Sequence, residues 1–415
     1  MEKSSMILIG VVVGIIIAMV VMYMKGELCC SWKKSSAYEG YDEFQALPPY
    51  ILNYDTRDNP LGIKVDKNYE NNYFIILGDW GCVATGNYKR QKAVADMMAS
   101  YIADHPTKNL LFVATLGDNF YQRGQNGKTW DKDWLGVYNK KLLSVPWFPV
   151  MGNHDWGNSD PWSVCPEGNS SSKKINGQAY KGNQLNNDKG TKRSSNTDNF
   201  WFPDYCYHYS INELSFELIA VSADYIDAPG GIGGSGVKKG KGAYQTNLNC
   251  EKAGVDLTSK LKTIYDAGLD LIAKRAKTTS NKNVIITSHY PSKQYHSKGS
   301  RDLRDDFIAN VPSKDKNSKT VVIAGGHVHS TGCQKLSSNK KLCLAILAGG
   351  GGGSCHNDDP PVKGNGFYVV NFDKNKNMST QQITYPYKRS KAIGFAHEYP
   401  VDVPESPDMC GGGDY

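Results

Sequence analysis

Five short segments of the sequence end in residues that bind metal ions well. They are Gly78–Gly81, Gly117–Tyr121, Gly152–Asp155, Ser288–Pro291 and Gly326–His329. In that order they supply Asp, Asp with Tyr, Asn with His, His, and a pair of His. Carboxylate, phenolate, amide and imidazole ligands without a thiolate suit a hard or borderline ion such as iron, manganese or zinc. These ligands are too many for one ion with an open position, so the sequence predicts two ions that share Asp118.

An apolar run of strand length precedes each of these segments. The runs are Tyr73–Leu77, Leu110–Leu116, Trp147–Met151, Val284–Thr287 and Val321–Ala324. A strand delivers the residues that follow it to the carboxyl edge of a sheet, where open α/β folds collect their chemistry. Five strand ends of this kind predict one site that binds more than one metal ion. Paired metals recur in enzymes that hydrolyse phosphate esters, because the two ions clamp the attacking and leaving oxygens.

The order and spacing of the segments resemble the calcineurin-like metallophosphoesterases and, within them, the purple acid phosphatases. The wider superfamily opens with Asp-x-His, whereas this chain has Asp79-Trp80-Gly81 and a tyrosine three residues after Asp118. That tyrosine is the purple acid phosphatase substitution. The likeness spans roughly Tyr73 to Tyr387 and is greatest to the mammalian, tartrate-resistant type. Three further stretches look like that subgroup: Leu116–Tyr121, Val145–Asp155 and Phe200–Tyr205.

The resemblance also implies which residues hold each ion. An Fe(III) ion would be held by Asp79, Asp118, Tyr121 and His329. A divalent ion (iron, zinc or manganese) would be held by Asn153, His289 and His327, with Asp118 bridging. This division is physically reasonable, because two carboxylates and a phenolate neutralise a trivalent ion while the other ligands are neutral.

Two histidines are the expected catalytic residues. His154 directly follows a ligand residue, so we expect its ring to face the substrate rather than the metals. The family has a second substrate histidine after the fourth motif, and His296 is the nearest candidate, although it lies closer to His289 than the family spacing requires. The alternative for His296 is a solvated loop residue.

The expected activity is the hydrolysis of phosphomonoesters, either small molecules or phosphoproteins, by an acid phosphatase. Fe(III) would lower the pKa of a bound water, which makes hydroxide available as the nucleophile even in acid. One alternative is a phosphodiesterase or nucleotide-hydrolysing enzyme with the same metals. Another, of a different class, is a non-catalytic surface interaction protein on the same scaffold. The complete set of ligands argues against the second alternative.

The sequence predicts an α/β fold, the two-sheet metallophosphoesterase sandwich (αββα) with helices on the outer faces. Apolar residues on a helical repeat predict helices at Asn87–Asp104, Trp130–Leu143 and Leu257–Ala276. The aromatic side chains of the second of these helices are expected to belong to the core.

One N-terminal transmembrane helix is expected before the sandwich. Met6–Met24 carries no charge and is long enough to cross the hydrocarbon core of a bilayer. Residues 25–72 would form a linker or stalk, 73–387 the catalytic domain and 388–415 a C-terminal tail. The lysines flanking the span favour a cytosolic catalytic domain. Cysteine usage favours a lumenal or extracellular one, and this is the location that we predict.

The chain has ten cysteines, and two of them predict a disulfide. Cys333 and Cys343 flank a turn between two short apolar runs, which indicates a hairpin closed by a disulfide that contributes about 2–4 kcal/mol. Asn169 and Asn377 each begin a sequence that accepts N-linked glycans in secreted proteins. Both features agree with a lumenal or extracellular domain.

Two insertions are rich in glycine, polar residues and lysine. Ser163–Asn199 and Pro229–Gly242 have too few apolar residues to bury a core, so flexible loops are expected there. They are either solvated insertions that account for the net charge of +7 or a source of positive potential that attracts phosphorylated substrates. The chain has no nucleic-acid-binding motif, and no nucleic-acid partner is expected.

Overall fold

The computed structural model describes residues 54–81, 89–121, 130–155, 184–185, 197–227, 257–292, 302–335, 340–353 and 363–387. The expected membrane span, the C-terminal tail, Asn169 and His296 lie outside these residues. Within the described part, no helix combines the length and the apolar character that crossing a bilayer requires. The described residues all belong to one compact unit.

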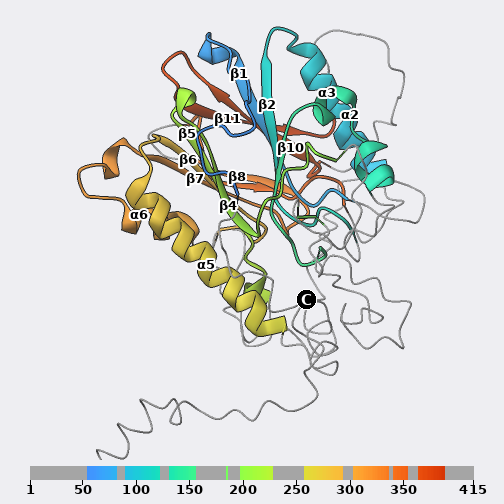
Figure 1. The fold of residues 1–415 in the computed structure, drawn as a ribbon. Helices are drawn as coiled ribbons and strands as arrows, with labels where there is room; N and C mark the ends of the chain where they lie inside the picture. The colour runs from blue at the N-terminus through green and yellow to red at the C-terminus, as the bar shows by residue number, and fades with distance from the viewer. Residues whose placement is uncertain are drawn as a thin grey trace, which may run out of the picture. The chain divides into compact units, whose positions relative to one another are not determined.

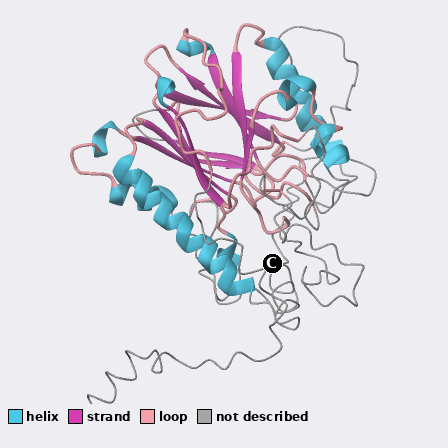
Figure 2. Ribbon diagram, viewed as in Figure 1, coloured by secondary structure: helices cyan, strands magenta, loops and turns pink. Residues whose placement is uncertain are grey.

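Two mixed β-sheets form the centre of this unit (Figures 1 and 2). The first has the strand order β11-β10-β1-β2-β3, and the second has the order β4-β5-β6-β7-β9-β8. In the first sheet β1, β2 and β3 run parallel, and in the second β5, β6, β7 and β9 do. Parallel neighbours place their carboxyl ends at the same edge, which is the arrangement that the metal motifs require.

The strands of the first sheet are β1 (Asn72–Leu77), β2 (Asn109–Thr115), β3 (Trp147–Pro149), β10 (Gly366–Phe372) and β11 (Met378–Thr384). Those of the second are β4 (Cys206–Ile211), β5 (Phe216–Val221), β6 (Asn283–Ser288), β7 (Thr320–Gly325), β8 (Thr331–Lys335) and β9 (Cys343–Ala348). The α-helices are α2 (Lys89–Asp104), α3 (Lys140–Leu143), α5 (Leu257–Thr278) and α6 (Leu303–Asn310). Short helical turns are η1 (Tyr69–Asn71), η2 (Trp130–Leu135), η3 (Asn212–Leu214), η4 (Asp224–Asp227) and η5 (Lys316–Ser318).

The sheets pack on each other through aromatic side chains. The ring of Phe74 in β1 lies 5.2 Å from that of Phe216 in β5, centroid to centroid, and Phe112 in β2 lies 5.7 Å from the same ring. Helices α2 and α3 lie beside the first sheet, and α5 and α6 cover the second (Figure 1). The predicted sandwich with outer helices is therefore the observed architecture.

The prediction of one helix over Trp130–Leu143 is wrong. This stretch forms η2, a turn of π-helix, and then the separate short helix α3. Gly136 falls at the break, and the side chain of Asn139 caps α3 by accepting the backbone N–H of Leu142 at 3.0 Å. A capping asparagine favours a new helix start over continuation of the old helix. Trp130 and Trp134 are nevertheless fully buried, as expected of core residues.

Residues of the predicted linker lie along β4. The hydroxyl of Tyr54 lies 2.9 Å from Nδ1 of His208, and the backbone N–H of Asn59 donates to the carbonyl of Ser210 at 2.8 Å. The backbone groups on this edge of the second sheet are thus partly satisfied from within the chain, which reduces the tendency of an edge strand to pair with another molecule.

The predicted disulfide between Cys333 and Cys343 is present, with 5.4 Å between the Cα atoms. It joins β8 to β9 at the other edge of the second sheet. The backbone N–H of Cys343 donates to the hydroxyl of Thr380 in β11 at 2.8 Å, so the hairpin is also attached to the first sheet. Cys206 is buried and carries a free thiol.

A buried ion pair fastens α5 to the second sheet. Glu217 in β5 has no exposed surface and accepts hydrogen bonds from Nε of Arg275 at 2.6 Å and Nη2 at 2.8 Å. Thr279 donates to the same carboxylate at 2.6 Å. Burial alone would raise the pKa of Glu217, but the bonds from Arg275 outweigh it and lower the pKa below its usual range.

Replacing Arg275 by Met is expected to destabilise the fold by about 3–5 kcal/mol, because Glu217 then becomes an uncompensated buried charge. Urea unfolding at neutral pH measures the change. Because the pKa of Glu217 is lowered in the folded state, the stability from this pair is complete above the usual carboxyl pKa and is lost as pH falls through the lowered value. The control is Lys262→Met on the same helix, which removes an exposed ion pair with Asp266. Equal effects of the two variants would contradict the prediction.

Candidate metal centre

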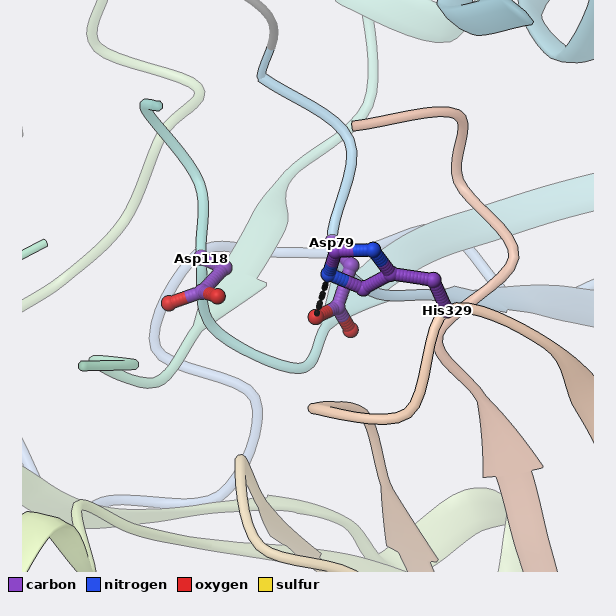
Figure 3. Close-up of side chains that lie close together, drawn as sticks. All are labelled: Asp79, Asp118 and His329. Carbon is purple, nitrogen blue, oxygen red and sulfur yellow. Dashed lines mark ion pairs between the residues drawn. The ribbon is translucent and has the colours of Figure 1, made fainter. Parts of the chain in front are cut away.

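All described residues that the sequence predicts as ligands lie where strands of the two sheets end. Asp79 follows β1, Asp118 and Tyr121 follow β2, and Asn153 follows β3. From the second sheet, His289 follows β6, while His327 and His329 follow β7. Figure 3 shows Asp79 and Asp118 on separate strand-end loops, with the ring of His329 beside Asp79. The facing carboxyl edges of both sheets therefore contribute to one site.

The first group of side chains is centred on Tyr121. Its hydroxyl lies 2.8 Å from Oδ2 of Asp118, 3.1 Å from Oδ1 of Asp79 and 2.9 Å from Nε2 of His329. One ligand atom from each of Asp79, Asp118 and His329 lies within 4.8 Å of the others, which is close enough for all three to bind one ion. These are the four residues that the sequence groups around Fe(III).

The second group meets at the side chain of Asn153. Its Oδ1 lies 2.9 Å from Nε2 of His289 and 3.1 Å from Nδ1 of His327. The two imidazole nitrogens are 3.3 Å apart, and Nε2 of His289 is 3.5 Å from Oδ1 of Asp118. Asp118 therefore directs one carboxylate oxygen to each group.

His154 lies beside the first group. Its ring centroid is 4.4 Å from that of Tyr121, and its Nε2 is 3.9 Å from Oδ2 of Asp118. Its backbone N–H donates to Oδ1 of Asp118 at 2.8 Å. The ring is thus adjacent to the first group. His296, the other predicted catalytic residue, lies outside the described residues.

Three of the strand-end residues have left-handed backbone conformations that residues other than glycine rarely adopt. The φ angles are 54° at Asp79, 48° at Asp118 and 67° at His327. Each such residue costs roughly 1–3 kcal/mol and persists only where the surrounding structure enforces it. The backbone N–H of His327 donates to both carboxylate oxygens of Asp79, at 3.1 and 2.9 Å, so two of these turns support each other.

The electrostatics of the site fit a bound cation. Burial and the neighbouring Asp118 raise the pKa of Asp79 well above its usual range. Burial also acts to raise the pKa of Asp118, but His289 and His154 outweigh it and leave the pKa lowered. Burial lowers the pKa of His329 to about 4, so its ring is neutral at ordinary pH and able to bind a metal. Two buried carboxylates beside the neutral imidazole of His329 form a donor set that suits a metal ion.

A run of glycines, Gly349–Gly353, makes backbone hydrogen bonds to the turn that carries Asp79. The backbone N–H of Gly351 donates to the carbonyl of Gly78 at 2.9 Å, and that of Gly353 donates to the carbonyl of Asp79 at 2.7 Å. A Cβ atom on Gly353 would lie 2.3 Å from Cε2 of Tyr121. The run is therefore glycine-rich because its backbone passes in direct contact with the site.

The sequence does not identify the residues that hold the ligand turns together. Asp155 is fully buried, and its carboxylate accepts the backbone N–H groups of Asn119 at 3.0 Å, Phe120 at 3.1 Å and Gly152 at 2.9 Å. Burial, followed by repulsion from Asp118, raises the pKa of Asp155 to about 7. The one sequence feature that could have indicated this role is the position of Asp155, a carboxylate two residues after the predicted ligand Asn153.

Asn119 connects three strand ends. Its Oδ1 accepts the hydroxyl of Thr115 at 2.7 Å and Nε1–H of Trp80 at 3.2 Å, and its Nδ2 donates to the carbonyl of Val150 at 2.8 Å. Trp80 follows Asp79, so the residues beside the ligands are bonded to one another even though their sequence positions are far apart.

Part of the chain is similar in sequence to known phosphatases. Human tartrate-resistant acid phosphatase type 5 is 35% identical over 89 residues, which are 20% of this chain and 26% of the human protein. Purple acid phosphatase 3 of Arabidopsis thaliana is 30% identical over 86 residues, 20% of this chain and 22% of the relative. The chain thus matches about a quarter of the length of these curated relatives. These matches support the superfamily rather than the mammalian-type subgroup.

Among solved structures, the chain is similar to "GAP50 the anchor in the inner membrane complex of Plasmodium". It is 18% identical to this chain and covers 79% of it, and 90% of that structure is covered in return, with a TM-score of 0.43. The model of the calcineurin-like phosphoesterase family matches residues 73–331. This match extends over more than half of the chain and includes all of the strand-end ligands, so the protein belongs to the calcineurin-like phosphoesterase family.

Proposed function

We propose that this protein is an acid phosphatase that hydrolyses phosphomonoesters with Fe(III) and a second, divalent metal ion. The observation that carries the proposal is the pair of ligand groups that share Asp118. One contains two carboxylates, each with an oxygen within 3.1 Å of the Tyr121 hydroxyl. The other joins Asn153 to two imidazoles. The partial matches to purple acid phosphatases support a phosphatase of this superfamily.

In this proposal Asp79, Asp118, Tyr121 and His329 would hold Fe(III), and Asn153, His289 and His327 would hold the divalent ion together with Asp118. The bound metals would supply Lewis acidity and an activated water to the reaction. Asp118 would fix the separation of the two ions through its two oxygens. Burial of Asp79, Asp118 and Tyr121 excludes bulk water behind the metals, which strengthens their attraction for a phosphate oxygen.

His154 is the residue that we propose for proton transfer. Its Nε2 lies near the carboxylate of Asp118, and its ring packs against that of Tyr121. The orientation of the ring is therefore set by two of the proposed ligands. A histidine in this place would donate a proton to the leaving oxygen of the ester or stabilise the charge that develops there. His296 remains the proposed second histidine of the same kind.

Metal analysis of the purified protein, combined with an assay on p-nitrophenyl phosphate between pH 4 and pH 8, tests the function. We expect iron and a second metal in each chain, and activity that is greatest in acid. Activity on phosphodiesters or nucleotides without activity on simple monoesters would support the alternative enzyme class. A protein that binds no metal and is inactive on every phosphate ester would support a non-catalytic interaction role.

Tyr121→Phe tests the identity of the trivalent ion. A phenolate bound to Fe(III) gives a charge-transfer band in the visible, and Tyr121 is the tyrosine whose hydroxyl contacts Asp79, Asp118 and His329. The wild-type protein is therefore expected to be violet or pink, and the variant colourless, with the fold retained because the ring remains. Visible absorption spectra, with circular dichroism as the check on folding, give the result.

The matched control is Tyr138→Phe, which changes another buried tyrosine outside the ligand groups. It should leave the visible band unchanged. An iron-containing wild type that is colourless, or a Tyr121→Phe variant with an unaltered band, would assign the chain to the wider family without iron–tyrosinate chemistry.

A further inference from the structure

Gln184 is a buried residue in the middle of the polar insertion Ser163–Asn199. Its exposed fraction is 1%, although the composition around it predicts a solvated loop. Its side-chain amide makes two hydrogen bonds in the described structure. Nε2 donates to Oδ1 of Asp155 at 2.8 Å, and Oε1 accepts Nδ2–H of Asn119 at 3.1 Å. A buried amide with its donor and its acceptor both satisfied is a fixed group.

The two partners of Gln184 are the residues that hold the ligand turns. Asp155 fastens Gly152, which precedes Asn153, and also fastens Asn119, which follows Asp118. Asp118 and Asn153 are the bridging ligand and a ligand of the second group. The side-chain amide of Gln184 therefore contacts both the carboxylate of Asp155 and the side chain of Asn119, which join the turns after β2 and β3.

Gln184 donates one hydrogen bond and accepts the other, and each of its two partners requires that direction. The carboxylate of Asp155 is oriented by backbone donors on the side of the turns, and Gln184 supplies a side-chain donor to the same oxygen that Phe120 contacts. The acceptor end of Gln184 holds Nδ2 of Asn119, which Val150 also binds. Loss of either end would leave a buried polar group partly unsatisfied next to a ligand turn.

We propose that Gln184 is a positioning residue, which holds the turns of Asp118 and Asn153 in register through Asp155 and Asn119 and thereby sets the affinity of the centre for its metals. The consequence for metals rests on the function proposed above, whereas the ordering of the turns does not. Contacts behind metal ligands typically change metal affinity by about 10–100-fold when they are removed.

The test uses two variants of Gln184 and one control in the full chain. Gln184→Met keeps the length of the side chain and removes both bonds. Gln184→Glu keeps an acceptor for Asn119 and removes the donor to Asp155. The control is Asn283→Leu, which removes another fully buried amide, at the amino end of β6, whose Nδ2 donates to the carbonyl of Lys376 at 2.7 Å. The control lies at the opposite end of β6 from His289.

The first measurement is hydrogen exchange on the metal-free proteins. Gln184→Met and Gln184→Glu are expected to accelerate exchange of the backbone N–H groups of Asn119, Phe120 and Gly152, the three that Asp155 accepts. Asn283→Leu should leave these amides at the wild-type rate. Unchanged exchange in the Gln184 variants, or the same acceleration in the control, would overturn the proposal.

The second measurement is the affinity for the metals by competition with a chelator, using zinc and iron as probes. Gln184→Met is expected to weaken the more loosely held ion by about tenfold or more, with no change in the control. Wild-type affinity in both Gln184 variants would overturn the inferred effect on the centre. A wild-type chain that takes up no metal would contradict the proposed function, and the exchange measurement alone would then decide whether Gln184 orders the turns.

Discussion

Replacing Asp118 by Ala is expected to reduce phosphatase activity to background and to release both metal ions. Asp118 is the residue common to the two ligand groups, with Oδ2 at 2.8 Å from the Tyr121 hydroxyl and Oδ1 at 3.5 Å from Nε2 of His289. Removing it takes a carboxylate from each group at once and leaves the second group without a charged ligand. Metal content per chain and the rate on p-nitrophenyl phosphate measure the effect.

Two further variants make the result specific to the bridge. Asp79→Ala should weaken mainly the trivalent ion, because Asp79 contacts Tyr121 and His329 but belongs to the first group alone. Asp266→Ala removes an exposed carboxylate on α5 and should change neither metal content nor rate. An Asp118→Ala protein that retains both ions would show that the ions are not bridged by this residue.

His154→Ala is expected to lower kcat by about 10²–10⁴-fold while both metals remain bound, which is the usual effect of losing a general acid. The backbone N–H of His154, which donates to Asp118, is retained in the variant, so the bridging carboxylate keeps that support. The loss should be greater for substrates with poor leaving groups, such as phenyl phosphate, than for p-nitrophenyl phosphate, because a poor leaving group depends more on protonation.

Steady-state kinetics on both substrates, together with metal analysis, distinguish this role from two others. Loss of metal with loss of activity would make His154 a ligand. An equal loss on both substrates would make it a binding residue for the phosphate group. His208→Ala serves as the control, because His208 is a buried histidine in β4 that contacts Tyr54 rather than the centre.

The sequence was sufficient to predict the sandwich and which strand-end side chains lie together. Runs such as Val284–Thr287 and Val321–Ala324 are apolar and of strand length, and parallel strands place their ends together by topology. Family resemblance then assigned residues that are far apart in sequence, such as Asp79 and His329, to one group. The structure brings those two side chains to 3.6 Å from each other.

What the sequence could not predict depends on contacts that leave no local pattern. Gln184 lies in a polar, lysine-rich stretch, and nothing in its neighbourhood distinguishes it from solvated residues. Its partner Asn119 is 65 positions away. The break between η2 and α3 was missed for a different reason: the aromatic residues Trp130 and Trp134 repeat with helical spacing, and this periodicity continues across a glycine and a capping asparagine.

The distribution of ligands between the two sheets has a consequence for how the protein is made. The first group combines Asp79, Asp118 and Tyr121, which are synthesised early, with His329, which is synthesised late. The second group likewise requires His327. Neither proposed metal position would be complete until both sheets have packed, because the second group needs His327 and the first needs His329. Metal loading should therefore follow synthesis. The ions would then bind between two sheets that have already packed without them. Because bound metal stabilises the folded state, the supply of metal in the folding compartment would govern how much stable protein accumulates.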